Sequence, residues 1–298
     1  MTAGPQARRN LRIGFIGAGQ LAVPVAWSLA RAGFQVVGAA SRSQASAEKL
    51  SSGIPNARAF GDAQELAHES DLVVIAVPDD AIAPVARAVT WRQNHYVVHC
   101  SAATEVSALS AAAEQGASTG GFHPLQTFTN TEAAMQTLPG CAAAIEAEDQ
   151  SLLDLLWSMA TALGCHPFRL PAGARPLYHA SGSFAGSFLV RIMNDALDLW
   201  AAFGVDRETA FRALMPLTKG TVAALEVNGP VKGLAGPIAR ADVGTVERHI
   251  AAVRTHAPAL LPTYLDLARR SVPISEAKGG ASRDKLDILR ALLDRTVL

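Results

Sequence analysis

The first hydrophobic segment of the chain is an alternating, mostly apolar run at residues 11–16 that ends in a glycine turn. The run (LRIGFI) is typical of a β-strand, and it leads into the motif Gly17-x-Gly19-x-x-Ala22. Helical spacing of apolar positions follows over residues 20–32. A strand, a glycine turn and a helix in this order favour a dinucleotide-binding unit over an ordinary glycine-rich turn.

Each position of this motif has a physical role in the predicted unit. Gly17 permits the tight turn, and Gly19 allows the backbone to approach a pyrophosphate. The helix that starts around Gln20 and Leu21 offers free N–H groups and a partial positive charge to phosphate oxygens. We therefore interpret Gly17, Gly19, Gln20 and Leu21 as cofactor-binding residues.

Further apolar runs alternate with helical patterns over the first 170 residues. The run at residues 71–78 (DLVVIAVP) is apolar almost throughout, as in a strand that is covered on both faces. Other strands are predicted at residues 34–40, 96–100, 117–122, 141–145 and 165–170, and helices end near residue 50 or lie at 105–115 and 149–163. This alternation predicts an α/β fold with a Rossmann-like, doubly wound and mostly parallel sheet.

The strand pattern stops at the segment PAGARP, residues 171–176, and the remainder of the chain has helical spacing. Helices are predicted at residues 177–203, 207–225, 243–255, 257–270 and 283–295, with a glycine- and proline-rich loop at 228–242. The chain is thus predicted to form two domains, a Rossmann-like domain at residues 1–170 and an all-α domain at 171–298. The polar residues 1–10 are predicted to be a tail.

The residues after the second predicted strand bear on the choice of cofactor. An NAD site usually places an acidic residue here to bind the ribose hydroxyls, but this chain has Ser41-Arg42-Ser43. An arginine flanked by hydroxyls suits a ribose phosphate, so the sequence favours NADP, or NADPH in its reduced form. The alternative is that Ser41 or Ser43 only caps the following helix, and both roles are compatible. Val77 and Pro78, at the end of another strand, are expected to face the same cofactor.

Composition narrows the possible functions. Basic and acidic residues balance at 26 each among 298 residues, which gives no basis for binding nucleic acid or an acidic membrane. No segment has the ~20 consecutive apolar residues of a membrane span. The three cysteines lack a C-x-x-C spacing, which argues against a disulfide framework and a metal site and favours the cytoplasm.

Several motifs resemble a family of oxidoreductases with a Rossmann-like N-terminal domain and a helical C-terminal domain of unknown function. The most specific are HPLQTF at residues 123–128 and GPIAR at 236–240, with DLVVIAVPDD at 71–80, HCS at 99–101 and YHA at 178–180 in the same order. The layout is more distantly similar to ketopantoate reductase, pyrroline-carboxylate reductase and prephenate dehydrogenase. The resemblance implies an NADP-dependent reductase whose helical domain forms a homodimer and shares the active cleft.

The ends of the later strands carry candidates for proton transfer. His123 stands before Pro124, which stops a strand, so its ring is expected at the carboxyl edge of the sheet. Imidazole exchanges protons near neutral pH, and prephenate dehydrogenase carries a similar His-Pro; the alternative is a histidine that only bonds loop backbone. Gln126 either binds a carbonyl group or braces its loop. Ser101 either approaches the nicotinamide or caps a turn.

The helical half supplies further candidates. His179, Ser183, Ser187 and Arg191 recur every four residues and so share a helix face, which we expect to line the cleft between the domains. The alternative is a packing face, and it is the better explanation for Gly182 and Gly186. The helix also lacks the lysine that related hydroxyacid dehydrogenases use.

Arg240 is the candidate anchor for a substrate carboxylate. The alternative is an ion pair with Asp242, which would itself cap the next helix. The sequence therefore predicts an NADP(H)-dependent oxidoreductase for a small polar carbonyl or imine substrate, with His123, His179 and Arg240 as catalytic residues. A non-catalytic NADP(H)-binding regulator or scaffold is the alternative, because a fold alone does not establish catalysis.

Overall fold

The computed structural model describes residues 10–296 and divides into two compact units. Unit 1 ends at Gly186 and unit 2 begins at Ser187. The division falls later in the chain than the predicted boundary at residue 170, because the start of the first helix after that boundary is bonded to unit 1 through Arg175 and Tyr178. The predicted tail at residues 1–9 lies outside the described residues.

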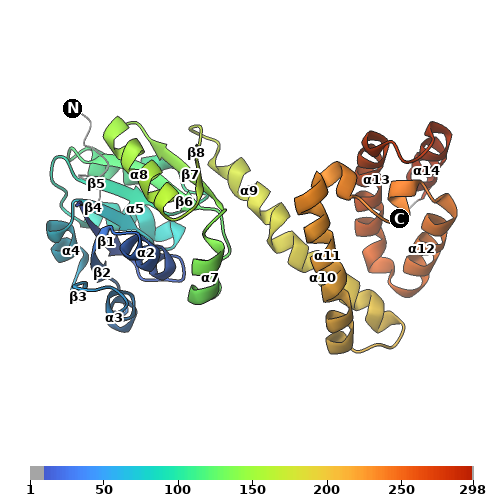
Figure 1. Ribbon diagram of the computed structural model, residues 1–298, viewed down its shortest axis with the longest axis horizontal. Helices are drawn as coiled ribbons and strands as arrows, with labels where there is room; N and C mark the ends of the chain where they lie inside the picture. The colour runs from blue at the N-terminus through green and yellow to red at the C-terminus, as the bar shows by residue number, and fades with distance from the viewer. Residues whose placement is uncertain (1–9, 297–298) are drawn as a thin grey trace. The chain divides into compact units, whose positions relative to one another are not determined.

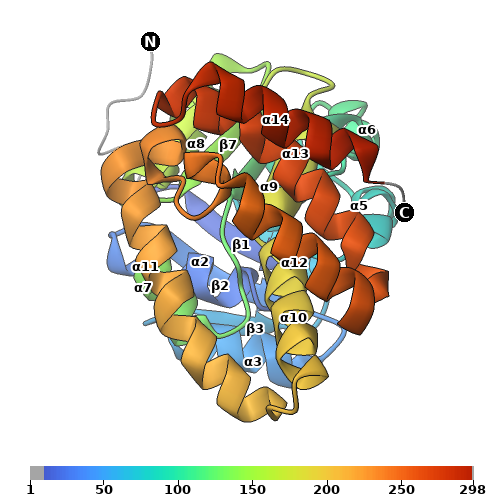
Figure 2. The same ribbon diagram turned by 90° about the vertical axis from the view of Figure 1, so that its right-hand side faces the viewer.

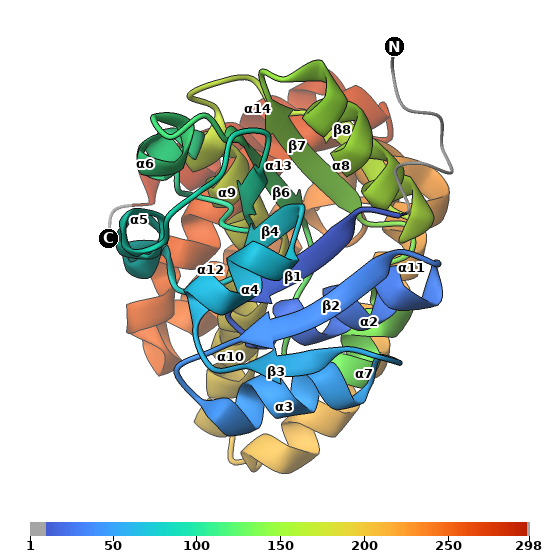
Figure 3. The same cartoon turned by 90° about the vertical axis from the view of Figure 1, so that its left-hand side faces the viewer.

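Unit 1 is built on one eight-stranded sheet (Figures 1 and 3). The strand order is β3-β2-β1-β4-β5-β6-β7-β8, and all neighbouring pairs are parallel except β6 and β7. The strands are β1 (Arg12–Ile16), β2 (Gln35–Ala40), β3 (Arg58–Phe60), β4 (Leu72–Ile75), β5 (Tyr96–His99), β6 (Ser118–Pro124), β7 (Ala142–Ala147) and β8 (His166–Arg169). The predicted Rossmann-like, mostly parallel sheet is confirmed, and the first six strands have the doubly wound order.

Helices cover both faces of this sheet, and each face has its own apolar core. The helices of unit 1 are α2 (Ala22–Arg31), α3 (Gln44–Ser52), α4 (Ala63–Glu69), α5 (Asp79–Ala88), α6 (Ser110–Ala113), α7 (Thr131–Thr137), α8 (Gln150–Ala162) and α9 (Arg175–Ala185), with a 3₁₀ turn η1 (Val106–Leu109). The core on one face joins α2, α3 and α8. The core on the other face joins α4, α5, η1 and α6. This arrangement leaves the carboxyl ends of the parallel strands as the natural place for a ligand.

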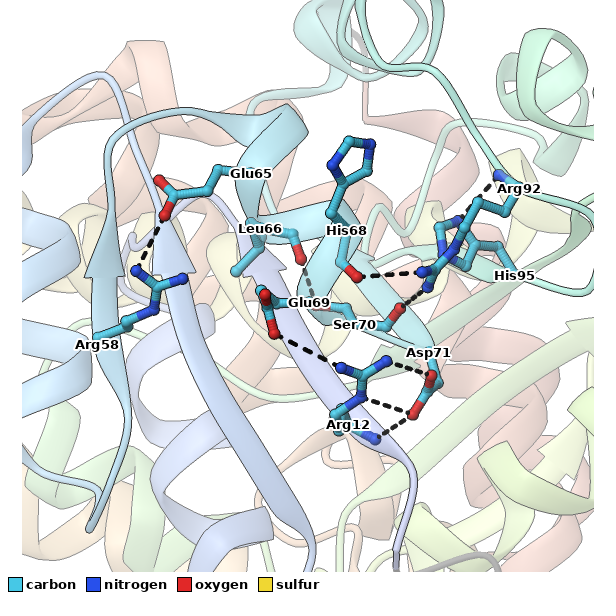
Figure 4. Close-up of polar contacts among 10 residues, drawn as sticks. All are labelled: Arg12, Arg58, Glu65, Leu66, His68, Glu69, Ser70, Asp71, Arg92 and His95. Atoms are coloured by element: carbon cyan, nitrogen blue, oxygen red, sulfur yellow. Dashed lines mark hydrogen bonds and ion pairs between the residues drawn. The ribbon is translucent and has the colours of Figure 1, made fainter.

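A polar network closes the opposite, amino edge of the sheet (Figure 4). Arg12 at the start of β1 forms a two-pronged ion pair with Asp71 before β4, at 3.0 and 3.2 Å. Burial alone would raise the pKa of the Asp71 carboxyl, but the hydrogen bonds from Arg12 outweigh it and hold that pKa below its usual range. Arg92 donates to the Ser70 carbonyl at 2.7 Å and to Nε2 of His95 at 2.7 Å. Burial lowers the pKa of His95 to about 4, so this histidine accepts the bond as a neutral ring.

Three short elements of unit 1 were not predicted: β3, α4 and α7. Each has seven residues or fewer, too few for a clear hydrophobic period. The strand predicted at residues 71–78 is shorter in the structure, where β4 covers only Leu72–Ile75.

Unit 2 is helical throughout its described part, as predicted. It consists of α10 (Ser187–Ala202), α11 (Arg207–Gly233), η2 (Ile238–Arg240), α12 (Val243–His256), η3 (Pro258–Leu260), α13 (Leu261–Lys278) and α14 (Arg283–Arg295). Its apolar core joins α12, α13 and α14, which lie together in Figure 2. The helix predicted at residues 177–203 is in fact two helices, because the backbone of Gly186 leaves the helical region (φ −117°, ψ −85°). Helix α11 runs past its predicted end, with a kink at Gly229.

Candidate functional site

A groove at the carboxyl edge of the sheet lies next to the glycine turn, and we call it the glycine groove. Its volume is about 510 Å³, and all its lining residues belong to unit 1. Among them are six of the residues that the sequence assigns to the cofactor: Gly17, Gly19, Ser41, Arg42, Val77 and Pro78. The ends of β1, β2 and β4 thus bring together three segments that are far apart in the sequence.

The two glycines of the turn are needed for different reasons. Gly17 has φ +99°, and a Cβ atom there would lie 2.3 Å from the carbonyl oxygen of Ala76. Gly19 has an ordinary φ, and a Cβ atom there would meet nothing within 4 Å. The fold itself therefore requires glycine at position 17 but not at 19. The open space beside Gly19 fits a ligand that approaches the backbone.

The start of α2 faces this space without a side-chain cap. Its N-cap residue Leu21 makes no capping hydrogen bond, and its first turn has no acidic residue. Gln20 is exposed and stands next to Gly19. Free N–H groups and the helix dipole at such a terminus favour a phosphate. The two residues thus adjoin the glycine groove.

Two residues after β2 have different roles: Ser43 caps the next helix, and Arg42 is exposed and makes no ion pair within residues 10–296. The hydroxyl of Ser43 caps α3 by accepting from the N–H of Ser46 at 3.3 Å, which is the capping role weighed above. Arg42 is exposed and forms no ion pair with any residue between 10 and 296. Its guanidinium therefore remains available to an anion in the groove.

His123 lies at the carboxyl edge, as expected from its position before Pro124, and it is paired with Tyr178 of α9. Its Nδ1 atom is 2.9 Å from the Tyr178 hydroxyl, and the two rings meet edge to face at 5.6 Å. Burial, together with the positive charge of Arg175, lowers the pKa of His123 to about 4. Burial also raises the pKa of Tyr178 to about 12. At neutral pH the pair is therefore a neutral imidazole hydrogen-bonded to a neutral phenol.

The same histidine is within electrostatic reach of the first residue of α5. The carboxylate of Asp79, which directly follows Val77 and Pro78 of the glycine groove, acts to raise the pKa of His123. In the sheet, β5 alone separates β4 from β6, so the His123–Tyr178 pair lies at the same edge of the sheet as the groove.

A fully buried arginine, Arg175, connects α9 to the sheet near His123 and Tyr178. Arg175, in the first turn of α9, donates from Nε to Glu146 of β7 at 2.9 Å and from Nη1 to the carbonyl of Ser101 at 2.7 Å. Its Nη2 atom occupies the space above Gly121, where a Cβ atom would lie only 1.8 Å away, and it bonds to no residue of the described chain. One guanidinium of α9 thus bonds to β7 and to the loop after β5, and it lies against Gly121 of β6.

Two loop residues have the structural roles that were weighed as alternatives. The hydroxyl of Ser101 accepts hydrogen bonds from the N–H groups of Ala103 and Thr104 and so caps its own turn. Gln126 donates to the Thr137 carbonyl at 3.0 Å and braces its loop. Ser101 does not line the glycine groove.

The candidates from the helical half are dispersed along the chain, and all but the half-buried Ser183 are exposed. His179 is exposed on α9, next to Tyr178. The row that starts at His179 is interrupted by the helix break at Gly186 before it reaches Arg191. Arg240 lies in unit 2, and Asp242 caps α12 through Thr245 rather than forming an ion pair with Arg240.

Sequence reasoning missed Arg175 and Tyr178. These residues and Gly182 follow the spacing i, i+3 and i+7, which places them on the face of α9 that packs on unit 1. A Cβ atom on Gly182 would lie 3.3 Å from Leu125, in agreement with this placement. The motif at residues 178–180 includes Tyr178, and its helical spacing from Arg175 is the signal in the sequence that connects the two residues.

The chain matches two family models. Residues 2–124 match a Rossmann-like domain, and residues 141–271 match a domain of unknown function (DUF2520). No protein of curated function matches the sequence.

Solved structures share the fold over most of the chain. A Bacteroides fragilis protein proposed to be an NADP oxidoreductase has 23% identity and a TM-score of 0.70, covering 90% of this chain and 99% of its own. A reductive aminase of Aspergillus terreus, in complex with NADPH and ethyl-5-oxohexanoate, has 17% identity and a TM-score of 0.62, covering 94% and 100%. Pyrroline carboxylate reductase of Plasmodium falciparum, with NADP bound, has 14% identity and a TM-score of 0.58, covering 95% and 98%. At these identities the likeness shows a common fold.

Proposed function

We propose that this chain, which combines a Rossmann-like domain with a DUF2520 domain, is an NADP(H)-dependent oxidoreductase of a small polar carbonyl or imine compound that bears a carboxylate. The observation that carries the proposal is the glycine groove, with Arg42 at one side and the His123–Tyr178 pair at the same edge of the sheet. Structures of the same fold that hold NADPH or NADP support it.

The residues of the groove fit an NADP cofactor. Such a cofactor would supply or accept hydride. The open space beside Gly19 and the uncapped start of α2 would hold the pyrophosphate, and Arg42 would bind the ribose phosphate. No acidic residue directly follows β2 to select the ribose hydroxyls of NAD.

We assign Tyr178 as the residue that donates a proton to the substrate. Its raised pKa keeps the phenol protonated at neutral pH, as a donor to a developing alkoxide or amine nitrogen requires. His123 has too low a pKa to act as a cationic acid, so its neutral ring orients the Tyr178 hydroxyl through their 2.9 Å contact. We assign the substrate carboxylate to Arg240 and keep His179 as a residue that contacts substrate.

Arg42→Ala is expected to lower the affinity for NADPH about 10- to 100-fold and to leave the affinity for NADH nearly unchanged. The reason is the loss of a charged hydrogen-bonding group, typically about 1.5–3 kcal/mol. Fluorescence titration of the variant with each nucleotide measures the effect. Arg87→Ala, in the last turn of α5, is the matched control and should bind as the parent protein does. Equal loss for both nucleotides, or tighter binding of NADH by the parent protein, would contradict the assignment.

Turnover distinguishes the proposed oxidoreductase from a non-catalytic NADP(H) sensor. The protein is mixed with NADPH and a panel of keto acids and cyclic imines, and oxidation of the cofactor is followed by absorbance. Consumption that depends on one compound of the panel supports the enzyme. Tight NADPH binding with no consumption across the panel supports the sensor.

We also propose that the chain forms a homodimer through unit 2 and works in the cytoplasm. Helices α10 and α11 expose a run of large apolar side chains that is typical of an interface, comprising Phe188, Leu189, Val190, Ile192, Phe211, Leu217, Val222, Leu225 and Val227. Within residues 10–296, no helix is both long and apolar enough to cross a membrane.

Leu217→Glu is expected to convert the dimer to a monomer, because it would place a charge in the apolar interface. Sedimentation equilibrium measures the mass. Ile288→Glu, at an exposed apolar position of α14, is the control and should leave the mass unchanged. A parent protein that sediments as a monomer would contradict the dimer.

A further inference from the structure

Two cysteines that are distant in the sequence meet at the edge of the sheet. Cys141 directly precedes β7 and Cys165 directly precedes β8, and these strands pair in parallel from Ala142 and His166 onward. The pairing extends one residue further, because the N–H of His166 donates to the Cys141 carbonyl at 2.8 Å. The two sulfur atoms lie 3.5 Å apart.

The backbone at this point is suited to a disulfide. Neighbouring strands lie about 4.8 Å apart, within the range of about 4.4–6.8 Å that separates the Cα atoms of bridged cysteines. A bond of about 2.05 Å requires the sulfur atoms to approach each other by about 1.5 Å, which side-chain rotation can supply.

The surroundings make the two thiols unequal. Cys141 is half-buried, and its contact with Cys165 lowers its thiol pKa, against the opposing effect of burial. Cys165 is buried, and the same contact raises its thiol pKa. Cys141 is the more exposed of the two sulfur atoms and is therefore the one that a peroxide reaches first, which leaves Cys165 as the resolving thiol. The third cysteine, Cys100, is buried, and burial raises its pKa to about 12.

We propose that Cys141 and Cys165 are a redox modification site and form a reversible intramolecular disulfide on exposure to a peroxide. The Cys141 thiolate attacks one oxygen of hydrogen peroxide and breaks the O–O bond, and the sulfur becomes a sulfenic acid as hydroxide leaves and takes up a proton. The Cys165 sulfur then attacks the sulfenic sulfur, the S–O bond breaks, and water leaves with the Cys165 proton. Two thiols and one peroxide thus give one disulfide and two waters, and a dithiol reductant reverses the change.

This site adjoins the proposed proton donor. The Cys141 thiolate acts to raise the pKa of Tyr178, so the two groups interact electrostatically. The next residue, Ala142, accepts a hydrogen bond at 2.7 Å from the N–H of Leu125, two positions after His123. The disulfide joins the start of β7 to the start of β8. We therefore expect oxidation to change turnover, a consequence that rests on the proposed function.

Peptide mapping tests the disulfide itself and does not depend on activity. The full chain is freed of reductant, treated with a small excess of hydrogen peroxide, and digested without reduction. We expect a linked pair of peptides carrying Cys141 and Cys165, loss of two of the three thiols, and full recovery of the thiols with dithiothreitol. Cys100→Ser should form the same link.

Cys141→Ser and Cys165→Ser should each form no intramolecular link. The proposal is overturned if peroxide carries Cys141 to sulfinic acid without a link, links separate chains, or leaves both thiols intact. Where NADPH turnover has been found, the oxidised and reduced proteins are then compared. A mapped disulfide without any turnover would count against the proposed function and leave the modification site standing.

Discussion

Glu146→Gln is expected to lower the free energy of unfolding by about 3 kcal/mol. Glu146 is the only carboxylate within 4 Å of Arg175 among the described residues, and Arg175 has no exposed side-chain surface. Removing one partner of a buried ion pair leaves the other charge uncompensated, at a cost of about 3–5 kcal/mol. We expect the lower end of this range, because the amide oxygen of glutamine still accepts the hydrogen bond from Nε.

Chemical denaturation of the two proteins at neutral pH measures this difference. Glu148→Gln is the matched control: it makes the same change two residues away, on an exposed side chain for which the structure shows no ion pair within residues 10–296. Its effect should stay within about 0.5 kcal/mol. Equal denaturation midpoints for the two variants would contradict this prediction. They would mean that the charge of Glu146 does not stabilise the buried Arg175.

The sheet could be predicted well from sequence, because strands buried on both faces are continuous apolar runs. The run at residues 71–78 is of this kind, and it forms the central strand β4. The strand before Gly17 was found from its alternating, mostly apolar run and from the glycine turn that follows it. Edge strand β3 has three residues and gives no such signal. The end of unit 1 was missed for a different reason. Hydrophobic spacing continues across Gly186, whereas the break there is a backbone conformation.

The candidate site was predicted in part. Positions that depend on local chain geometry, such as Gly17, Arg42 and Pro78, meet in one groove because parallel strands end at one edge. Residues whose role depends on a distant partner could not be found in this way. In the sequence, Arg175 is only a basic residue that follows a loop. Its partner Glu146 lies 29 residues earlier, so the pair becomes visible only in the folded chain. The sequence predicts His179 as a catalytic residue because its imidazole is titratable, but the adjacent Tyr178 is the residue that contacts His123.

Tyr178→Phe is expected to lower kcat for the reduction about 10²- to 10³-fold and to leave NADPH affinity unchanged. General acid catalysis by one positioned side chain typically contributes about 10²–10⁴-fold. The variant removes only the hydroxyl that lies 2.9 Å from Nδ1 of His123, while the ring keeps its contact with Phe168. Steady-state kinetics with the substrate identified from the panel measure kcat, and a nucleotide titration measures affinity.

Tyr264→Phe provides a control with the same chemistry elsewhere in the chain. Tyr264 of unit 2 also contacts a histidine, with its hydroxyl 3.0 Å from Nδ1 of His249 and the rings edge to face at 6.0 Å. Tyr264→Phe removes a comparable hydrogen bond and should keep full turnover. This result would show that the loss in Tyr178→Phe comes from catalysis and not from lower stability. His123→Ala should reduce kcat less than Tyr178→Phe, because the imidazole positions the hydroxyl and the hydroxyl supplies the proton. If Tyr178→Phe keeps full turnover while His123→Ala abolishes it, the proton comes from the histidine, and the assignment of the two roles is reversed.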